Sequence, residues 1–261
     1  MRLYWEMARL GFKRYATYRG ATFAGVFTNT VFGFMLAFVS LSLFTSRARV
    51  AGYDATDAIT YVWVTQGLLS TVHVGGWSEI AQRVRTGDVA TDFHRPFDFQ
   101  GYWLAQDLGR AAYHAIFRGI PPAAVAALVF PLRLPSRPAT WPLFGLSVLL
   151  AVCISFSIRF LANMAAFWIT DFRGVVSITA ATVPFLAGMY GIPLAFLPPA
   201  AFAVLRALPF AGMGQAPLTV FLQKPDVAAT LALQAAWALA LLAAGRLVLR
   251  AAHRRLVVQG G

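Results

Sequence analysis

The side chains that could carry out chemistry are few and scattered in this chain. A Walker A phosphate loop needs a lysine directly after a glycine, and neither Lys13 nor Lys224 follows one. The four histidines show no metal-ligand spacing, and no Gly-x-Ser-x-Gly nucleophile motif occurs. The single cysteine, Cys153, lies in an apolar run and is interpreted as a packing residue. The sequence therefore predicts no catalytic residue, no bound cofactor and no metal site.

Three polar side chains fall inside apolar segments long enough to cross a membrane: Arg118, Arg159 and Asn163. Such groups are costly in lipid and usually face a bundle interior or the headgroups. Because Arg159 and Asn163 are four residues apart, they share one helix face. One interpretation is that the three residues line a polar path or bind an anionic group. The other, which we favour, is an interhelical hydrogen-bond clip or an arginine that reaches the inner headgroups.

The most charged stretch, residues 77–110, holds four arginines and five acidic residues. Its first part predicts a helix with Trp77, Ile80 and Val84 on one side. Gly87 predicts the end of that helix, because glycine readily adopts a left-handed turn. Pro96 disfavours helical conformation at the residue before it.

These residues must be positioned by long apolar helices. Residues 20–46 contain no charge over 27 positions, and residues 174–205 contain none over 32. About 20 apolar residues cross a hydrocarbon core of about 30 Å. We therefore expect an all-α polytopic membrane protein, with one transmembrane domain over residues 1–261. Six spans are expected at about 21–44, 58–76, 111–132, 141–168, 175–197 and 227–245.

Prolines in the third span and in the segment between the fifth and sixth spans affect the expected fold. Pro121 and Pro122 should break or kink the third span, because each removes a backbone donor. Residues 199–223 are apolar but interrupted by Pro209 and Pro217, which predicts a re-entrant or interfacial outer hairpin rather than a crossing. The spans contain no Asp or Glu, so a carrier mechanism based on a buried carboxylate is not expected.

The N-terminal segment, residues 1–19, places Arg2, Glu6, Arg9 and Lys13 on one helical stripe. This pattern predicts an amphipathic helix on the membrane surface; a disordered basic tail is the alternative.

The charge distribution predicts the orientation. With both termini in the cytoplasm, cytoplasmic segments carry 14 basic residues and outer segments six, as the positive-inside rule requires. The formal net charge of +12 is thus explained by helix ends facing anionic lipid, and nucleic-acid binding is not expected.

Several stretches together resemble permease subunits of the type-2 ABC exporter family. The segments Gly87-Asp88 and Phe93-His94-Arg95-Pro96 are similar to the family's "G-D/E … L-x-R/K-P" element, with Phe-His replacing a Leu-Leu-type pair. The N-terminal helix resembles its interfacial helix. Residues 166–174 resemble its tight turn between the fourth and fifth spans, and residues 193–217 resemble its proline-punctuated outer hairpin. Among branches, permeases for export of drugs and viologen-like cations, the multidrug efflux type, are the most similar.

The resemblance implies a transport subunit without its own ATP site, in the bacterial inner (plasma) membrane. Its implied partners are two copies of an ABC ATPase subunit, a second permease in a homo- or heterodimer, and membrane lipid. The implied ATPase-coupling residues are Trp77, Glu79, Ile80, Arg83, Val84, Arg85, Gly87, Asp88, Arg95 and Pro96. The rival interpretations are an ATP-independent carrier or channel, and, less favoured, a membrane-bound enzyme.

Overall fold

The computed structural model describes residues 2–72 and 75–259, with side chains described through Arg255. Within these ranges the regular structure is helical, apart from one isolated bridge between Val50 and Tyr53. The all-α prediction is therefore confirmed. His73 and Val74, which fall in the predicted second span, lie outside the described residues, as do Met1, Gly260 and Gly261.

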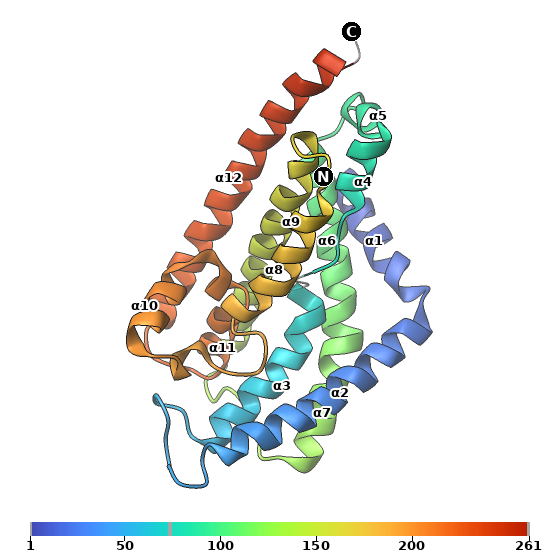
Figure 1. Cartoon of the computed structure of the whole chain (residues 1–261). Coiled ribbons are helices and arrows are strands. Elements are labelled where there is room, and N and C mark those ends of the chain that lie inside the picture. The colour runs from blue at the N-terminus through green and yellow to red at the C-terminus, as the bar shows by residue number, and fades with distance from the viewer. Residues whose placement is uncertain (1, 73–74, 260–261) are drawn as a thin grey trace.

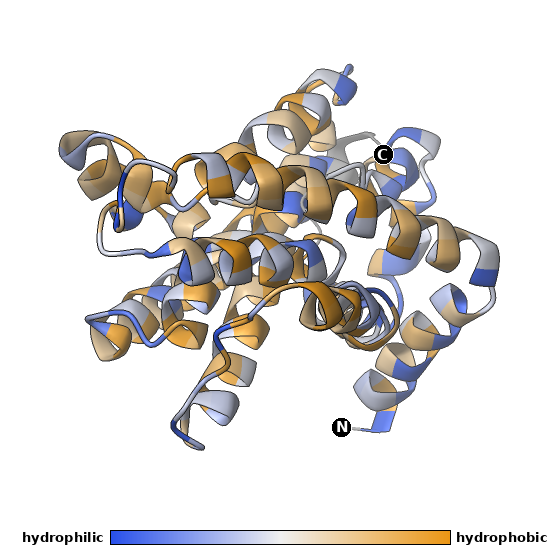
Figure 2. Ribbon diagram, turned by 90° about the horizontal axis from the view of Figure 1, so that it is seen from below, coloured by the Kyte–Doolittle hydropathy of each residue, from blue (hydrophilic) through white to orange (hydrophobic). Residues whose placement is uncertain are grey.

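Four helices in the described part of the chain are long and apolar enough to cross a membrane. They match the predicted first, third, fourth and sixth spans, with shifted ends. Hydrophobic residues run along these helices, and hydrophilic ones gather toward helix ends and connections (Figure 2). The four are α2 (Arg19–Ser42), the continuous helix Phe99–Val129, α8 (Thr140–Met164) extended by a 3-10 turn to Phe167, and α12 (Val227–Gln259).

The third span is predicted to begin near residue 111, but the helix begins at Phe99. It consists of α6 (Phe99–His114), a π-helical segment η1 (Ala115–Gly119) and α7 (Ile120–Val129). The helix does not break at Pro121 and Pro122, although its α-helical geometry is interrupted directly before them, and the alternative of a kink stays a prediction. These prolines occupy the first turn of α7, where a missing N–H leaves no lost hydrogen bond, and the π-helical turn before them carries the helix onward.

Helix α3 (Ala55–Val72), the predicted second span, forms the centre of the bundle. Tyr61, Val62 and Trp63 are all completely buried, and α2, α6, η1, α7 and α8 all contact this helix. Because other helices surround α3, its side chains face protein and not lipid. The helix can therefore cross a membrane without a uniformly apolar sequence. Its first turn contains the buried carboxylate of Asp57.

The predicted fifth span is shorter than expected. Helix α9 (Arg173–Leu186) ends eleven residues before Leu197, after Pro184, and glycines with positive φ follow at Gly188 and Gly191. The outer segment folds as η3 (Leu194–Phe196), α10 (Pro199–Ala207), η4 (Pro209–Gly212) and α11 (Gln215–Phe221). Helix α11 is buried against α8, whereas no residue of α10 is buried.

The predicted N-terminal helix is present as α1 (Arg2–Ala16), and it packs along α6. The backbones approach closely at Gly11 and Gly109: a Cβ on Gly109 would lie 1.8 Å from the carbonyl oxygen of Ala8. The outer face of α1 remains exposed and carries Trp5 and Leu10. Figure 1 shows α1, α4, α5 and the C-terminal part of α12 at one end of the molecule, with α10 and α11 toward the other.

Candidate functional site

Helices α4 (Glu79–Thr86) and α5 (Val89–Phe93), with the loop to residue 98, form a tip at one end of the bundle (Figure 1). Gly87 ends α4 in the left-handed region with φ of +83°, as the sequence predicts. The Asp98 side chain accepts a hydrogen bond from the Gly101 backbone N–H and caps α6. The tip is therefore a short, well-ended helical unit joined directly to the longest central helix, Phe99–Val129.

The inner face of the tip packs firmly into the bundle. Ile80 and Ala81 are completely buried, and Val84 is half-buried. Trp77 contacts the Trp103 ring at 5.6 Å and the Phe156 ring at 6.1 Å, between ring centroids. The apolar side chains that the sequence places on one side of this helix thus hold it to α6 and α8.

Asn163 on α8 fixes the start of α4 through its side-chain amide. Its Oδ1 accepts a hydrogen bond of 3.0 Å from the Ala81 backbone N–H. Its Nδ2 donates to the Trp77 carbonyl at 2.8 Å and to the Arg159 carbonyl at 2.8 Å. The amide therefore bridges two points of the chain around α4 and joins them to α8.

Two predicted coupling residues are already engaged in ion pairs within the chain. Arg83 donates two hydrogen bonds, of 2.5 and 2.9 Å, to the buried carboxylate of Asp92 on α5. Arg14 on α1 pairs with Glu79 at 3.1 Å. The bond to Asp92 raises the pKa of Arg83, and the bond to Glu79 raises the pKa of Arg14. These pairs hold α4 to its two neighbours.

The remaining predicted coupling residues lie on the outer surface of the tip. Arg85, Gly87, Asp88, Arg95 and Pro96 are all exposed. Asp88 accepts a hydrogen bond of 2.7 Å from the Thr86 hydroxyl, and no ion pair engages the arginines in the described structure. We call these five residues the outer rim. They are exposed at the surface of the tip.

A buried charge cluster lies beneath the tip. Asp107 on α6 accepts hydrogen bonds from Arg110, at 2.7 Å, and from Arg159 on α8, at 2.7 and 3.3 Å. Arg110 also donates to the carbonyls of Ser70 and Thr71 at the end of α3. The Arg159 guanidinium lies 5.4 Å from the centroid of the Trp77 ring. The cluster therefore joins α3, α6, α8 and the start of the tip.

Asp107 lies in a helix that is long and apolar enough to cross a membrane, although the sequence places it before the third span. Sequence analysis assigns it to the charged loop because Asp107 and Arg110 lower the local hydropathy. The structure instead places both in the 31-residue helix Phe99–Val129. Their three-residue spacing, typical of a helical ion pair, was the signal that could have revealed this.

The third candidate polar-path residue, Arg118, lies apart from this cluster. It is half-buried in η1, where its guanidinium fills the notch that Gly25 leaves on α2: a Cβ on Gly25 would lie 2.0 Å from it. Its Nε has no hydrogen-bond partner among the described residues. The structure therefore brings Arg159 and Asn163 together but not Arg118, and a continuous polar path stays a prediction.

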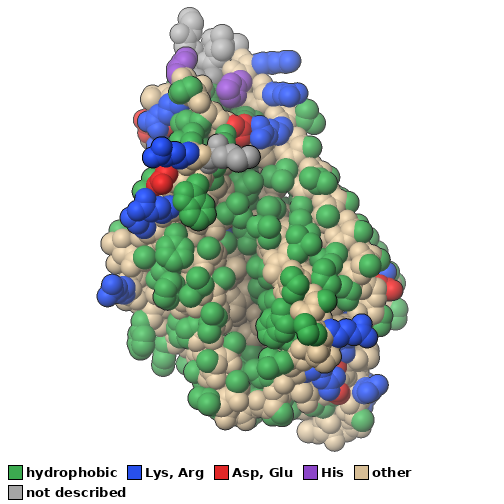
Figure 3. Space-filling view, turned by 180° about the vertical axis from the view of Figure 1, so that it is seen from behind, with side chains coloured by type: hydrophobic (Ala, Val, Ile, Leu, Met, Phe, Trp, Pro, Cys, Tyr) green, Lys and Arg blue, Asp and Glu red, His purple; other side chains and the backbone are tan. Residues whose placement is uncertain are grey.

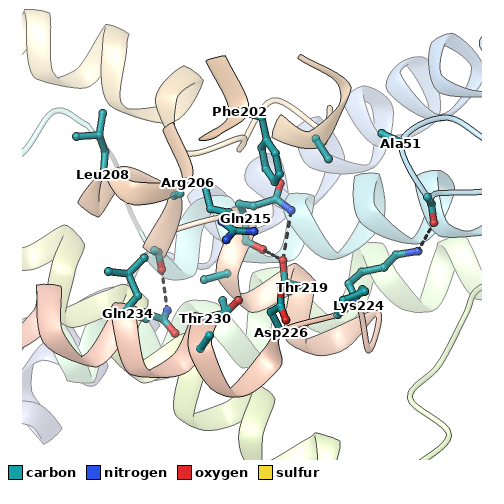
Figure 4. A pocket seen from close by; sticks show the side chains of 18 of the residues that line it. Ala51, Phe202, Arg206, Leu208, Gln215, Thr219, Lys224, Asp226, Thr230 and Gln234 are labelled. Carbon is teal, nitrogen blue, oxygen red and sulfur yellow. Dashed lines mark hydrogen bonds between the residues drawn. The ribbon is translucent and has the colours of Figure 1, made fainter. Parts of the chain in front are cut away.

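The opposite end of the molecule contains a pocket of about 420 Å³ between the outer segment, the loop at Gly52 and α12 (Figure 4). Gln215, which lines this pocket, joins separate segments of the chain. Its Oε1 accepts hydrogen bonds from the Tyr61 hydroxyl and the Leu194 backbone N–H. Lys224 donates to Asp57 at 2.6 Å and lies over the Tyr53 ring. Sequence analysis missed these residues, because the contacts of Gln215 with Tyr61 and of Lys224 with Asp57 and Tyr53 join segments more than 150 residues apart.

The fold and the charge distribution define a helical membrane protein. Hydrophobic side chains cover the middle of the face in Figure 3, and basic ones lie toward its two ends. No cluster of potential metal ligands occurs in the described residues.

The family model described as ABC-2 family transporter protein matches residues 28–260, and the chain belongs to this family. The resemblance to type-2 ABC permeases is thereby confirmed, and the chain is supported as an ABC permease subunit. No curated protein matches the chain. Membership of the multidrug and viologen-exporter branch stays a prediction.

Proposed function

We propose that this chain is the membrane-spanning subunit of an ATP-driven exporter and that a separate ATPase docks on the outer rim of the α4–α5 tip. The observation that carries this proposal is the division of the tip into two faces. Ile80, Ala81 and Trp77 fasten one face to the bundle, while Arg85, Asp88 and Arg95 are exposed on the other. A part that transmits force must be rigid on one side and accessible on the other.

The route of transmission follows the polar contacts beneath the tip. Displacement of α4 acts on α8 through Asn163, and α8 is joined to α6 through the pair Arg159–Asp107. Arg110 then connects α6 to the end of the central helix α3. Hydrogen bonds to charged groups are the stronger ones in proteins, so these contacts resist separation better than apolar packing that can slide. The cluster serves here as a mechanical joint.

In this proposal the chain crosses the membrane six times, with both termini and the tip in the cytoplasm. Helices α3 and α9 cross in addition to the four long helices. The 18 residues of α3 extend about 27 Å, and its burial spares it from lipid. Helix α9 is shorter, and the turn that follows it extends across the rest of the membrane. The loop near Arg47, the outer segment and the pocket of Figure 4 then face outward.

Topology is tested by labelling single cysteines in a Cys153→Ala background with an impermeant maleimide. Ser46 and Thr91 are both exposed and provide a matched pair. Cysteine at position 46 should react in intact cells, and cysteine at position 91 only after permeabilisation. The reverse pattern would contradict the orientation.

Docking is tested by charge reversal on the outer rim. The double variant Arg85→Glu/Arg95→Glu should reduce recovery of the ATPase in a pull-down by tenfold or more, because buried interfacial charges contribute about 2–5 kcal/mol. The matched control is Arg47→Glu/Arg49→Glu, which reverses two exposed arginines in the loop at the opposite end. Equal recovery with both double variants, at equal thermal stability, would refute docking at the rim.

A further inference from the structure

A groove of about 500 Å³ lies between α1, the α4–α5 tip and α6. Arg95 is the one residue that this groove shares with the outer rim. Its lining includes four basic side chains, Lys13, Arg14, Arg83 and Arg95, and two acidic ones, Glu79 and Asp92. The groove therefore has an excess of positive charge.

Both carboxylates of the groove are already neutralised by partners. Glu79 pairs with Arg14, and Asp92 pairs with Arg83. Lys13 and Arg95 have no ion pair with any described residue. Two cations thus remain uncompensated across one opening, one from α1 and one from the tip. An anionic ligand would balance these two positive charges.

Trp103, which lines the groove, provides a second, independent observation. Trp103 on α6 lines the groove and is only 6% exposed, yet its indole N–H has no acceptor among the described residues. A buried donor without a partner is unfavourable. Trp103 also borders a smaller cavity of about 40 Å³ next to Asp107, Arg110 and Arg159. The groove is thus lined by two cations that make no ion pair among the described residues and by a tryptophan whose buried indole N–H lacks an acceptor there.

We propose that this groove binds the phosphate group of a membrane phospholipid. A phosphate accepts several hydrogen bonds and carries the charge that Lys13 and Arg95 lack. A lipid is favoured over a soluble phosphate because α1 is amphipathic: Leu10, which lines the groove, is 52% exposed, and Trp5 on the same helix is 71% exposed. Basic pockets of this kind between helices are suited to anionic headgroups. In the proposed topology the groove faces the cytoplasmic leaflet. Binding of the phosphate group does not depend on that topology.

The test uses the purified full chain in a neutral detergent, titrated with short-chain phosphatidylglycerol and followed by native mass spectrometry. The double variant Lys13→Gln/Arg95→Gln should weaken binding tenfold or more. Trp103→Phe, which removes only the N–H and keeps an aromatic ring, should weaken it several-fold. The control Arg2→Gln removes an exposed basic residue of α1 that does not line the groove, and it should bind like the wild type.

Two further probes separate lipid from other anions. Inorganic phosphate and the phosphate-free anionic detergent cholate should each bind at least tenfold more weakly than phosphatidylglycerol. Inorganic phosphate binding as tightly as the lipid would overturn the lipid assignment. Equal lipid binding by the wild type and the double variant, at equal thermal stability, would refute the site. The lipid-binding assay contains no ATPase. The lipid proposal can therefore be refuted while docking at the outer rim is supported, and docking can be refuted while lipid binding is supported.

Discussion

The Asn163 Oδ1 accepts a hydrogen bond of 3.0 Å from the Ala81 backbone N–H, and this contact joins the tip to α8. The side chain of Asn163 is completely buried, and its amide is satisfied on both its oxygen and its nitrogen. The joint between tip and bundle is therefore a polar contact shielded from water, where a hydrogen bond is hard to replace.

Replacing Asn163 with Ala should loosen this joint. The change leaves the Ala81 N–H and the Trp77 carbonyl without their partner, at about 1–3 kcal/mol for each group that stays buried. Hydrogen–deuterium exchange should accelerate across residues 79–86. The control Gln82→Ala changes an exposed side chain that bonds only Ser78 among the described residues. Unchanged exchange in Asn163→Ala would show that apolar packing alone holds α4.

Replacing Asp107 with Ala should be the most destabilising of these changes. It removes the only carboxylate facing Arg110 and Arg159 in the described ion pairs and leaves two buried cations unpaired. Breaking a buried pair in this way costs about 3–5 kcal/mol. Thermal unfolding in detergent should show a marked drop in midpoint, whereas Asp88→Ala at the exposed rim should unfold near the wild-type temperature. Equal midpoints for the two variants would count against a structural role of the cluster.

Substituting Gly109 with Ala should detach α1 from α6. The added Cβ would collide with backbone atoms of α1, and a backbone cannot move aside as a flexible side chain can. Gly145→Ala on α8 is the matched control, because no atom lies within 4 Å of its Cβ position. Limited proteolysis should cut α1 faster in Gly109→Ala only. Identical cleavage of both variants would mean that α1 is not seated against α6.

The carboxylate of Asp54 predicts a pH dependence in the loop before α3. Burial alone would raise its pKa, but the Asp57 backbone N–H and Arg133 outweigh burial and hold the pKa below its ordinary value. The ionised form is therefore favoured on folding. Its stabilisation is present at neutral pH and is lost as the pH falls through the lowered folded pKa.

The Asp54 contribution should be a few tenths of a kcal/mol, because solvent screens the half-exposed Arg133. Asp54→Asn should unfold at a lower temperature than the wild type at pH 7, and this difference should shrink as the pH falls below the ordinary aspartate pKa and toward the lowered folded pKa. The control Asp226→Asn alters an exposed carboxylate that makes no ion pair among the described residues. A difference that grows on acidification would reverse the assigned sign.

Local features of the tip were predictable from the sequence, and its long-range contacts were not. Gly87 was recognisable because glycine ends helices by its own conformational freedom, and the inward face at Ile80 follows from helical spacing. The pairing of Arg83 with Asp92 joins two separate short helices, and the pairing of Arg159 with Asp107 spans 52 residues. Nothing in the order of residues specifies which opposite charges will meet.

The same limit explains the misplaced third span. Hydropathy treats Asp107 and Arg110 as residues in water, because it does not register that α8 and the end of α3 satisfy them. The proline rule predicts an interruption at Pro121 and Pro122, and the structure shows one in the α-helical geometry although the helix continues. The rule holds for the interior of a regular α-helix, whereas here a π-helical segment precedes the prolines and places them in a first turn.

The most direct test of docking is site-specific photocrosslinking to the ATPase in an assembled complex. A benzoylphenylalanine should be introduced at Thr91, an exposed residue on the tip beside the outer rim, and at Ser46 in the loop at the opposite end. We predict a crosslink between position 91 and the ATPase and none from position 46. An intact complex that crosslinks from position 46 but not from position 91 would contradict the proposed coupling through the tip.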